Sequence, residues 1–298
     1  MKIICLNLRN LALLIVLFVF SAKFVVAQEV KTEKSLLWEV SGNGLEKPSF
    51  LFGTIHIICE DEMVWSADID AALGSAEKIV LELDMDDPKE MQGMQQLVMN
   101  PGMSNFSDKL SEEDKSTLNT FFTDNYGMGM KQLGIMKPFA LMSMVMPKYL
   151  ECARPGSYEG KLVQLAKAQE KEILGLESAA FQTGIFDNLP FEKQVELLMT
   201  TVEDFDKGKE DFAKMVGTYR AQDLNALYNM IKESPEYAEL TEEMLDKRNM
   251  NWIPKLEEMM KAQSVFIAVG VGHLASEKGV INLLREQGYT LKPLMAQQ

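Results

Sequence analysis

The chain contains only two histidines, and each closes a Gly-x-x-His tetrapeptide that follows an apolar run: Gly53-Thr54-Ile55-His56 and Gly270-Val271-Gly272-His273. Imidazole binds divalent metals and transfers protons near neutral pH. Two imidazoles with one or two carboxylates would make a three- or four-ligand site for zinc, manganese or cobalt, with an open position where water can ionise. The two matching motifs therefore predict one shared site.

Each motif lies in the same local pattern of strand, Gly-x-x-His, helix and strand. Ser66 is a suitable N-cap for the first helix, and Gly288 a suitable stop for the second. Each unit is a parallel crossover, expected to be right-handed, which places its histidine at the carboxyl end of a strand, where open α/β sheets bind ligands. We therefore expect an α/β fold with a central mixed or parallel sheet, an α+β arrangement being the alternative. The predicted strands are 49–52, 79–83, 266–269 and 289–291.

A long insertion, 88–261, separates the two units and has mainly helical patterning. It is rich in methionine, which suits ordinary helix packing or a pliable surface for apolar peptide; a copper site is an alternative because thioether sulfur favours soft metals. The predicted helices are 115–122, 136–146, 161–170, 191–200, 211–219, 223–231 and 241–260.

The N-terminal residues 1–27 have the pattern of a secretory signal. Lys2 and Arg9 precede an apolar stretch, and small residues end at Ala27, so we expect cleavage after Ala27 and one domain over 28–298. A retained membrane anchor is the alternative, but the apolar run is shorter than the roughly 20 residues that a spanning helix needs. The sequence thus predicts a secreted or periplasmic protein without a stable membrane anchor after cleavage.

The composition is strongly acidic. The formal net charge of −14 becomes −17 when the signal leaves, because three cations and no acids go with it. Such a surface repels nucleic acids and anionic membranes. The mature chain keeps Cys59 and Cys152, which in an oxidising compartment could form one disulfide or remain as two buried thiols.

Motifs spread over nearly the whole mature chain resemble those of the TraB/GumN family of Tiki-like metalloproteases, within a wider superfamily that includes erythromycin esterase-like and ChaN-like proteins. Their order and spacing carry the resemblance; Phe139 stands where the family often has Trp, and Glu159 where it frequently has Asp. The motifs are Leu37-Trp38-Glu39-Val40, Phe52–His56, Leu81-Glu82-Leu83-Asp84, Lys137-Pro138-Phe139, Ser157-Tyr158-Glu159, Gly175-Leu176-Glu177, Gln182, Arg248-Asn249, Trp252 and Val269–His273.

The resemblance implies a metal-dependent peptidase, with His56 and His273 as metal ligands and Glu82 as ligand or general base. Glu82 lies on the strand after the first helix, so the sheet could hold its carboxylate near His56. The alternative is a strand-end acid on the solvent side, because an acidic turn follows directly.

Four further polar residues are candidates for the site: Glu159, Glu177, Arg248 and Asn249. Either acid could instead cap a helix or face solvent. Arg248 can hold a substrate carboxylate or an oxyanion through paired donors, or it can form an intramolecular bridge to one of the many acids.

Two other functions stay open at the level of sequence. The zinc-protease signature His-Glu-x-x-His is missing, since His56 continues as Ile57-Ile58-Cys59-Glu60. The resemblance to the erythromycin esterase-like branch implies a metal-free hydrolase as one alternative, in which one histidine, oriented by Glu82, is a general base. TraB proteins are associated with shutting down peptide pheromone signals, so the resemblance also implies a non-catalytic protein that sequesters a peptide in a methionine-lined groove. Peptide or protein substrates remain the expected partners.

Overall fold

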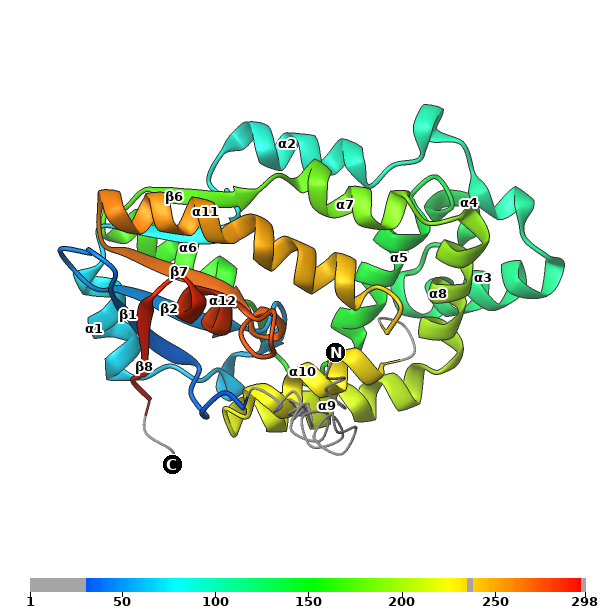
Figure 1. The fold of residues 1–298 in the computed structure, drawn as a ribbon. Coiled ribbons are helices and arrows are strands. Elements are labelled where there is room, and N and C mark those ends of the chain that lie inside the picture. The colour runs from blue at the N-terminus through cyan, green and yellow to red at the C-terminus, as the bar shows by residue number, and fades with distance from the viewer. Residues whose placement is uncertain (1–30, 235–237, 296–298) are drawn as a thin grey trace, which may run out of the picture.

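The protein is described by a computed structural model that covers residues 31–234 and 238–295, in which six strands form one mixed sheet (Figure 1). The sheet order is β6-β4-β7-β2-β1-β8; the first four strands are mutually parallel, and β1 is antiparallel to both of its neighbours. The α/β class and the mixed sheet are confirmed. The strands are β1 (Leu37–Gly42), β2 (Ser49–Thr54), β4 (Lys78–Leu83), β6 (Ile173–Glu177), β7 (Val265–Gly270) and β8 (Tyr289–Pro293).

The two repeated units interlock within this sheet. The first runs from β2 through α1 (Ala67–Ser75) to β4, and the second from β7 through α12 (Val280–Glu286) to β8. β7 lies between β2 and β4, so the second unit fills the gap that the first leaves. The strands that precede the two histidine motifs are therefore direct neighbours.

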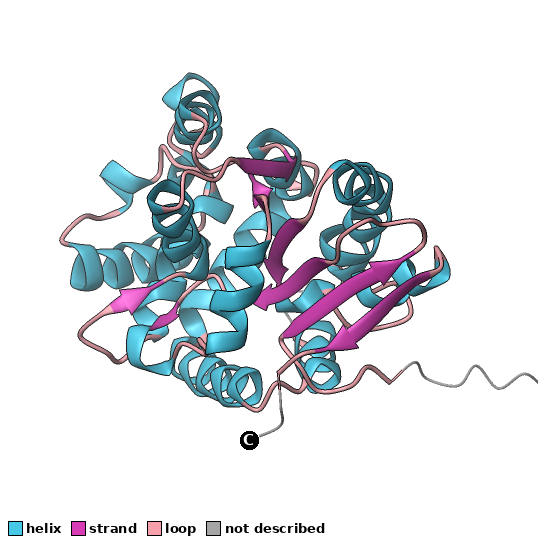
Figure 2. Cartoon of the chain, turned by 90° about the vertical axis from the view of Figure 1, so that its left-hand side faces the viewer, coloured by secondary structure: helices cyan, strands magenta, loops and turns pink. Residues whose placement is uncertain are grey.

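Both central strands are covered on both faces. Every residue of β2 and of β7 is buried, as expected for the apolar runs of a parallel sheet between helices. Figure 2 shows helices on both sides of the strands. The helices nearest the sheet include α6 (Tyr158–Ala168) and α11 (Lys247–Ala262). Ser66 caps α1 as predicted, its side chain accepting a hydrogen bond from the Ile69 amide.

The insertion is mainly helical and builds a second apolar core beside the sheet, towards the right of Figure 1. It also supplies β6 and α6 to the sheet layer. The expected helices occur with shifted ends, whereas α2, α4 and α7 were not expected. The helices here are α2 (Pro88–Leu97), α3 (Glu112–Tyr126), α4 (Met130–Leu133), α5 (Pro138–Val145), α7 (Ala179–Asp187), α8 (Phe191–Glu203), α9 (Phe205–Arg220), α10 (Leu224–Glu233) and the π-helical turn η5 (Glu242–Asp246) that leads into α11.

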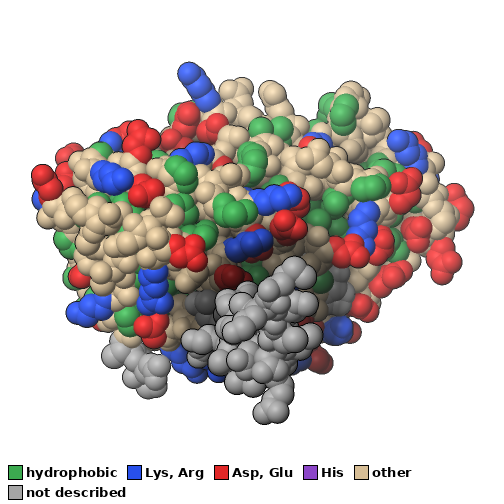
Figure 3. Space-filling model, viewed as in Figure 1, with side chains coloured by type: hydrophobic (Ala, Val, Ile, Leu, Met, Phe, Trp, Pro, Cys, Tyr) green, Lys and Arg blue, Asp and Glu red, His purple; other side chains and the backbone are tan. Residues whose placement is uncertain are grey.

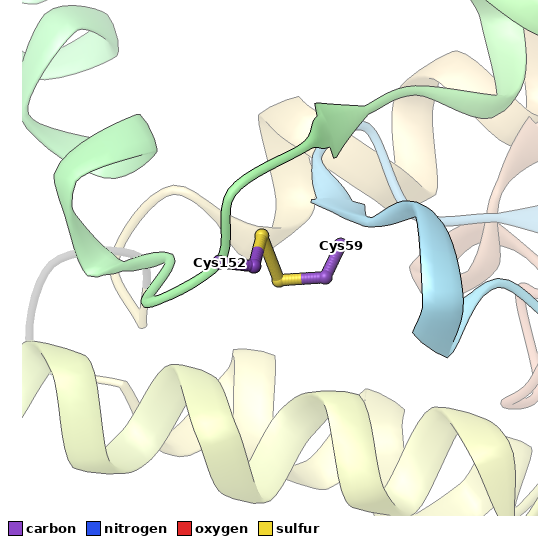
Figure 4. The surroundings of a disulfide bond; sticks show 2 residues. All are labelled: Cys59 and Cys152. Carbon is purple, nitrogen blue, oxygen red and sulfur yellow. A yellow bond between two sulfur atoms is a disulfide. The ribbon is translucent and has the colours of Figure 1, made fainter.

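A disulfide joins Cys59 to Cys152, which resolves the alternative left open by the sequence (Figure 4). The cross-linked segments also pair as a short two-stranded sheet of β3 (Ile58–Cys59) and β5 (Pro155–Gly156). This link connects the segment after the first histidine motif to the segment before α6.

The surface matches the acidic composition. On the face in Figure 3, acidic side chains are interspersed with basic ones, and no broad basic patch forms. Within residues 31–234 and 238–295, no helix is long and apolar enough to cross a bilayer. The predicted signal, 1–27, lies outside the described residues.

Candidate active site

The two Gly-x-x-His motifs meet at the carboxyl ends of β2 and β7. The strands are parallel and in register, with Thr54 opposite Gly270. A methyl group placed on Gly270 would lie 3.2 Å from Glu82 Oε1, 3.5 Å from His56 Nε2 and 3.6 Å from His273 Cδ2. Two imidazoles and one carboxylate therefore surround a single point above Gly270, which we call the convergence point.

Glu82 comes from the other neighbour of β7. The backbone pairing of β4 with β7 ends at Leu81 and Ala268, and the Glu82 carboxylate accepts the Gly270 amide through Oε1 at 2.8 Å. The same oxygen lies 3.8 Å from His273 Nε2. The Glu82 side chain is only 11% exposed, so the alternative of a solvent-facing acid is wrong.

Arg248 bridges the carboxylates of Glu82 and Glu177. Arg248, on α11, donates through Nη2 to Glu82 Oε2 at 2.5 Å and through Nε to Glu177 Oε1 at 2.8 Å. Glu177, at the end of β6, also accepts the Trp252 indole N–H at 3.0 Å. The Gln182 amide donates to both carboxylates, at 3.1 Å to Glu82 and 2.8 Å to Glu177. Arg248 thus forms the intramolecular bridge, and Glu177 is a buried anchor behind the convergence point.

This network keeps Glu82 ionised. Burial opposes the charge, but the nearby His273 ring, the Arg248 guanidinium and the Gly270 amide outweigh burial and hold the pKa of Glu82 well below its usual range. Burial likewise opposes the charge of Arg248, yet Glu82 and Glu177 raise its pKa. A carboxylate of such low basicity is a poor general base near pH 7 and is better suited to binding a cation.

Asn249 fixes the orientation of His273. The Asn249 amide nitrogen donates to the backbone carbonyls of His273 and Lys278, so its carbonyl oxygen faces the ring and accepts the Nδ1 proton at 2.6 Å. Burial, with the positive charge of Arg248, outweighs Glu82 and lowers the pKa of His273 to about 3. The ring is therefore neutral at pH 7, and its Nε2 lone pair faces the Glu82 side.

His56 has a different environment. Its Nδ1 donates to Glu159 Oε1 at 3.1 Å, and the Thr54 hydroxyl donates to the same oxygen at 2.8 Å. Desolvation by the neighbouring protein atoms lowers its pKa, but the hydrogen bond and the charge of Glu159, with the charge of Glu82, outweigh that effect and raise the pKa to about 9. The side chain is 66% exposed, so solvent screens part of this attraction. His56 is the outer ligand candidate and His273 the inner one.

A cavity of about 320 Å³ opens at this site. It combines apolar walls with the polar side chains of His56, Glu82, Glu159 and Gln182, whereas His273 lies outside its lining. A larger cavity, of about 990 Å³, lies at the disulfide, but its lining contains neither histidine. Of the two, the smaller cavity is the one that reaches His56 and Glu82. It is lined by His56, Leu81, Glu82, Leu83, Met85, Ser157, Glu159, Gln182 and Ala268.

The residues predicted for the site fall into two layers. His56, His273 and Glu82 face the convergence point, whereas Glu159, Glu177, Arg248 and Asn249 hold those three in place. Sequence reasoning did not assign roles to Thr54, Gln182 or Trp252. Thr54 had a usable signal, because it lies two residues before His56 on an extended segment and so can face the same side.

The donor types fit a divalent cation. The Nδ1 protons of both histidines are held by oxygen acceptors, which leaves Nε2 of each ring as the atom that can bind a metal, the usual arrangement of metal-binding imidazoles. Nε2 of His273 is already neutral, whereas Nε2 of His56 must first lose its proton. In the part of the chain described, no three or more His, Cys, Asp or Glu side chains form a closed ion-binding cluster. The donors are close to one another, and binding an ion would require them to draw together.

Replacing Asn249 by Ala should weaken the site without removing a donor to the convergence point. Loss of the Nδ1 acceptor frees the His273 ring and its tautomer, and supports of this kind contribute about 10- to 100-fold to metal affinity or activity. Titration calorimetry with Zn²⁺ or Mn²⁺ measures the change. Asn282→Ala is the matched control. The Asn282 amide on α12 makes only exposed hydrogen bonds, to Glu277 and Glu286, so its loss should leave the affinity unchanged.

Comparison with known proteins identifies the family of this chain. The chain is similar to a zebrafish (Danio rerio) protein named "Metalloprotease TIKI2", with 23% identity over an alignment that covers 88% of this chain and 61% of that protein. This chain thus spans about three fifths of the length of that relative. No solved structure matches it. A model of the TraB/PrgY/gumN family matches residues 36–293, which include both histidine motifs and all their supports, and the chain therefore belongs to the TraB/PrgY/gumN family.

Proposed function

We propose that this protein is a metal-dependent hydrolase that acts on peptides, with a divalent cation held by His56, His273 and Glu82. The convergence of these three side chains at Gly270 carries the proposal. The name of the zebrafish relative supports the same reaction class. Zinc, manganese or cobalt suits two imidazoles and one carboxylate.

Each residue of the site has a distinct task in this proposal. His273 offers a neutral Nε2, because Asn249 holds its Nδ1 proton. Glu82 offers a carboxylate oxygen whose position is set by the Gly270 amide. Glu159 orients the exposed His56 ring from the cavity wall. When bound, the ion would polarise the scissile carbonyl and lower the pKa of water.

The His56–Glu159 pair supports a second candidate, a metal-free hydrolase. A histidine hydrogen-bonded to a carboxylate at a cavity wall can accept a proton from water. In this case Glu159, rather than Glu82, orients the ring. The two candidates differ in metal content, which is measurable directly.

The proposed compartment is the periplasm or the exterior of the cell. The signal-like pattern of 1–27 and the Cys59–Cys152 disulfide both support an oxidising compartment. N-terminal sequencing of the protein recovered from its native compartment should begin at Gln28. A mature chain that retains Met1 would contradict this assignment.

Elemental analysis tests the metal. Protein purified without chelators should carry about one ion per chain, and the variant His56→Ala/His273→Ala should carry none. Cleavage of a peptide library should then require Zn²⁺, Mn²⁺ or Co²⁺ and disappear in the same variant. Equal activity of metal-free and metal-loaded protein would support the second candidate, and peptide binding without cleavage that survives both substitutions would point to capture.

Metal affinity should rise with pH. The raised pKa of His56 means that the ring is protonated near neutral pH, so an ion must displace that proton. Apparent affinity should therefore increase by about tenfold per pH unit and level off by about pH 9, the upper limit set by that pKa. Competition titrations with a chromogenic chelator between pH 6 and 10 would measure it. In Glu159→Gln the plateau should begin at lower pH, because the charge that favours protonation is gone.

A further inference from the structure

The disulfide joins the chain segments that carry His56 and Glu159, the outer half of the site. Cys59 is three residues after His56, and Cys152 is seven residues before Glu159. Between the two segments, Ile58 pairs with Gly156 and Cys59 with Pro155, and the Glu60 amide donates to the Arg154 carbonyl at 3.0 Å. Figure 4 shows the sulfur bridge joining the two backbones beside this ladder. The cross-link thus spans the two segments whose side chains form the His56–Glu159 contact.

The two halves of the site are held very differently. His273 is buried, lies 4.3 Å from the Trp252 ring between centroids, and is fixed by Asn249. By contrast, the His56 side chain is 66% exposed, and its ring is hydrogen-bonded to the Glu159 carboxylate. One exposed hydrogen bond stabilises a contact only weakly. A two-stranded sheet with two residues per strand is likewise marginal on its own.

Glu159 has anchors that do not involve the disulfide, whereas the His56 segment is held by the buried side chains of Ile55 and Ile58 and by the cross-link at Cys59. Tyr158 is fully buried, and its hydroxyl accepts the Val64 amide at 2.6 Å. Ser157 caps α6, and Thr54 donates to the Glu159 carboxylate. These contacts keep α6 and Glu159 in place whether or not the sulfurs are joined.

We propose that the Cys59–Cys152 disulfide holds the exposed His56 ring against Glu159, so that reduction releases the His56–Glu159 contact, while the His273 half of the site is independent of the cross-link. Both cysteines line the 990 Å³ cavity, which gives a small dithiol access to the sulfurs. In the reduction, the S–S bond takes two electrons and two protons and becomes two thiols, and the dithiol becomes a disulfide. This inference goes beyond the proposed function, and its test needs neither substrate nor metal.

The test uses the two histidines as their own reporters. In full-length protein labelled with ¹⁵N-histidine, two ring spin systems are expected, and His273→Gln assigns them. Oxidised protein should show a His56 ring whose Nδ1 is protonated and hydrogen-bonded to Glu159. Addition of a dithiol to the folded protein, and separately Cys59→Ser/Cys152→Ser, should shift the His56 nitrogens to the values found in Glu159→Ala, which defines the unanchored ring. Reoxidation of the wild type should restore the original shifts.

The His273 shifts are the internal control, because they should stay unchanged in every one of these samples. Unchanged His56 shifts in the reduced protein and in the double serine variant would overturn the proposal. Equal changes at both rings would also overturn it, since they would show general loosening of the fold. Reduction of the pre-folded wild type guards against a serine variant that fails to fold.

Discussion

Replacing Arg248 by Met should destabilise the fold by about 3–5 kcal/mol, the usual cost of removing one member of a buried ion pair. The substitution leaves Glu82 and Glu177 facing each other without the cation that both now contact at 2.5 Å. All three side chains are at most 11% exposed, so solvent cannot compensate. Urea denaturation followed by circular dichroism would measure the loss.

Lys247→Met is the matched control for this prediction. Lys247 is the preceding residue on α11 and pairs with Glu243, but both side chains are about half exposed, so its loss should change stability by less than about 1 kcal/mol. The penalty in Arg248→Met should shrink as the pH falls, because protonation of the two carboxylates removes the unpaired charges. A variant as stable as Lys247→Met at pH 7 would show that the bridge is dispensable.

The stability of the wild type should respond to acid in the opposite direction to that of Arg248→Met. The pKa of Glu82 lies well below its value in an unfolded chain, so its contribution to stability is fully present above the unfolded pKa of 4.5 and is lost as the pH falls through the folded pKa. Arg248 is the charge whose removal reverses this trend.

The convergence of the two histidines could be predicted because the sequence of each strand alone shows where the strand lies and where it ends. Apolar runs 49–52 and 266–269 are long enough for covered strands, and parallel strands align their carboxyl ends on one edge of the sheet. The α/β class followed from the same repeated pattern. The position of β7 between β2 and β4 could not be predicted, because the apolar sequence of a buried strand does not indicate which strands pair with it.

The supports of the site were less visible in the sequence. Arg248 could serve a substrate or a neighbouring acid equally well, and only the fold shows that β6 brings Glu177 to it. Gln182 lies only 5 residues after Glu177, but its second acceptor, Glu82, is 100 residues away in the sequence. Trp252 lies 75 residues from Glu177, so its role also depends on the fold. The pairing of β3 with β5 could not be predicted, because a two-residue strand has no periodicity to detect. The Cys59–Cys152 pairing joins residues 93 positions apart and depends on the fold.

Gly270→Ala should remove activity by on the order of 10³-fold while leaving the fold intact, because a methyl group would occupy the convergence point itself. Its nearest neighbours would be Glu82 Oε1 at 3.2 Å and His56 Nε2 at 3.5 Å, so it would displace whatever ion or water those atoms hold. The backbone at Gly270, with φ −51° and ψ 133°, suits alanine as well as glycine. Thermal unfolding should therefore shift little.

Gly53→Ala is the control that separates occupancy of the site from damage to the fold. At Gly53 the added methyl would come within 2.7 Å of Leu274 and 3.1 Å of Val271, both in the core, so the expected result is a loss of about 1–3 kcal/mol of stability. Peptide cleavage, metal binding and thermal unfolding measured on both variants distinguish the two effects. If Gly270→Ala binds metal and cleaves peptide as the wild type does, the space above Gly270 is not where the reaction takes place, and the histidines and Glu82 converge for structural reasons alone.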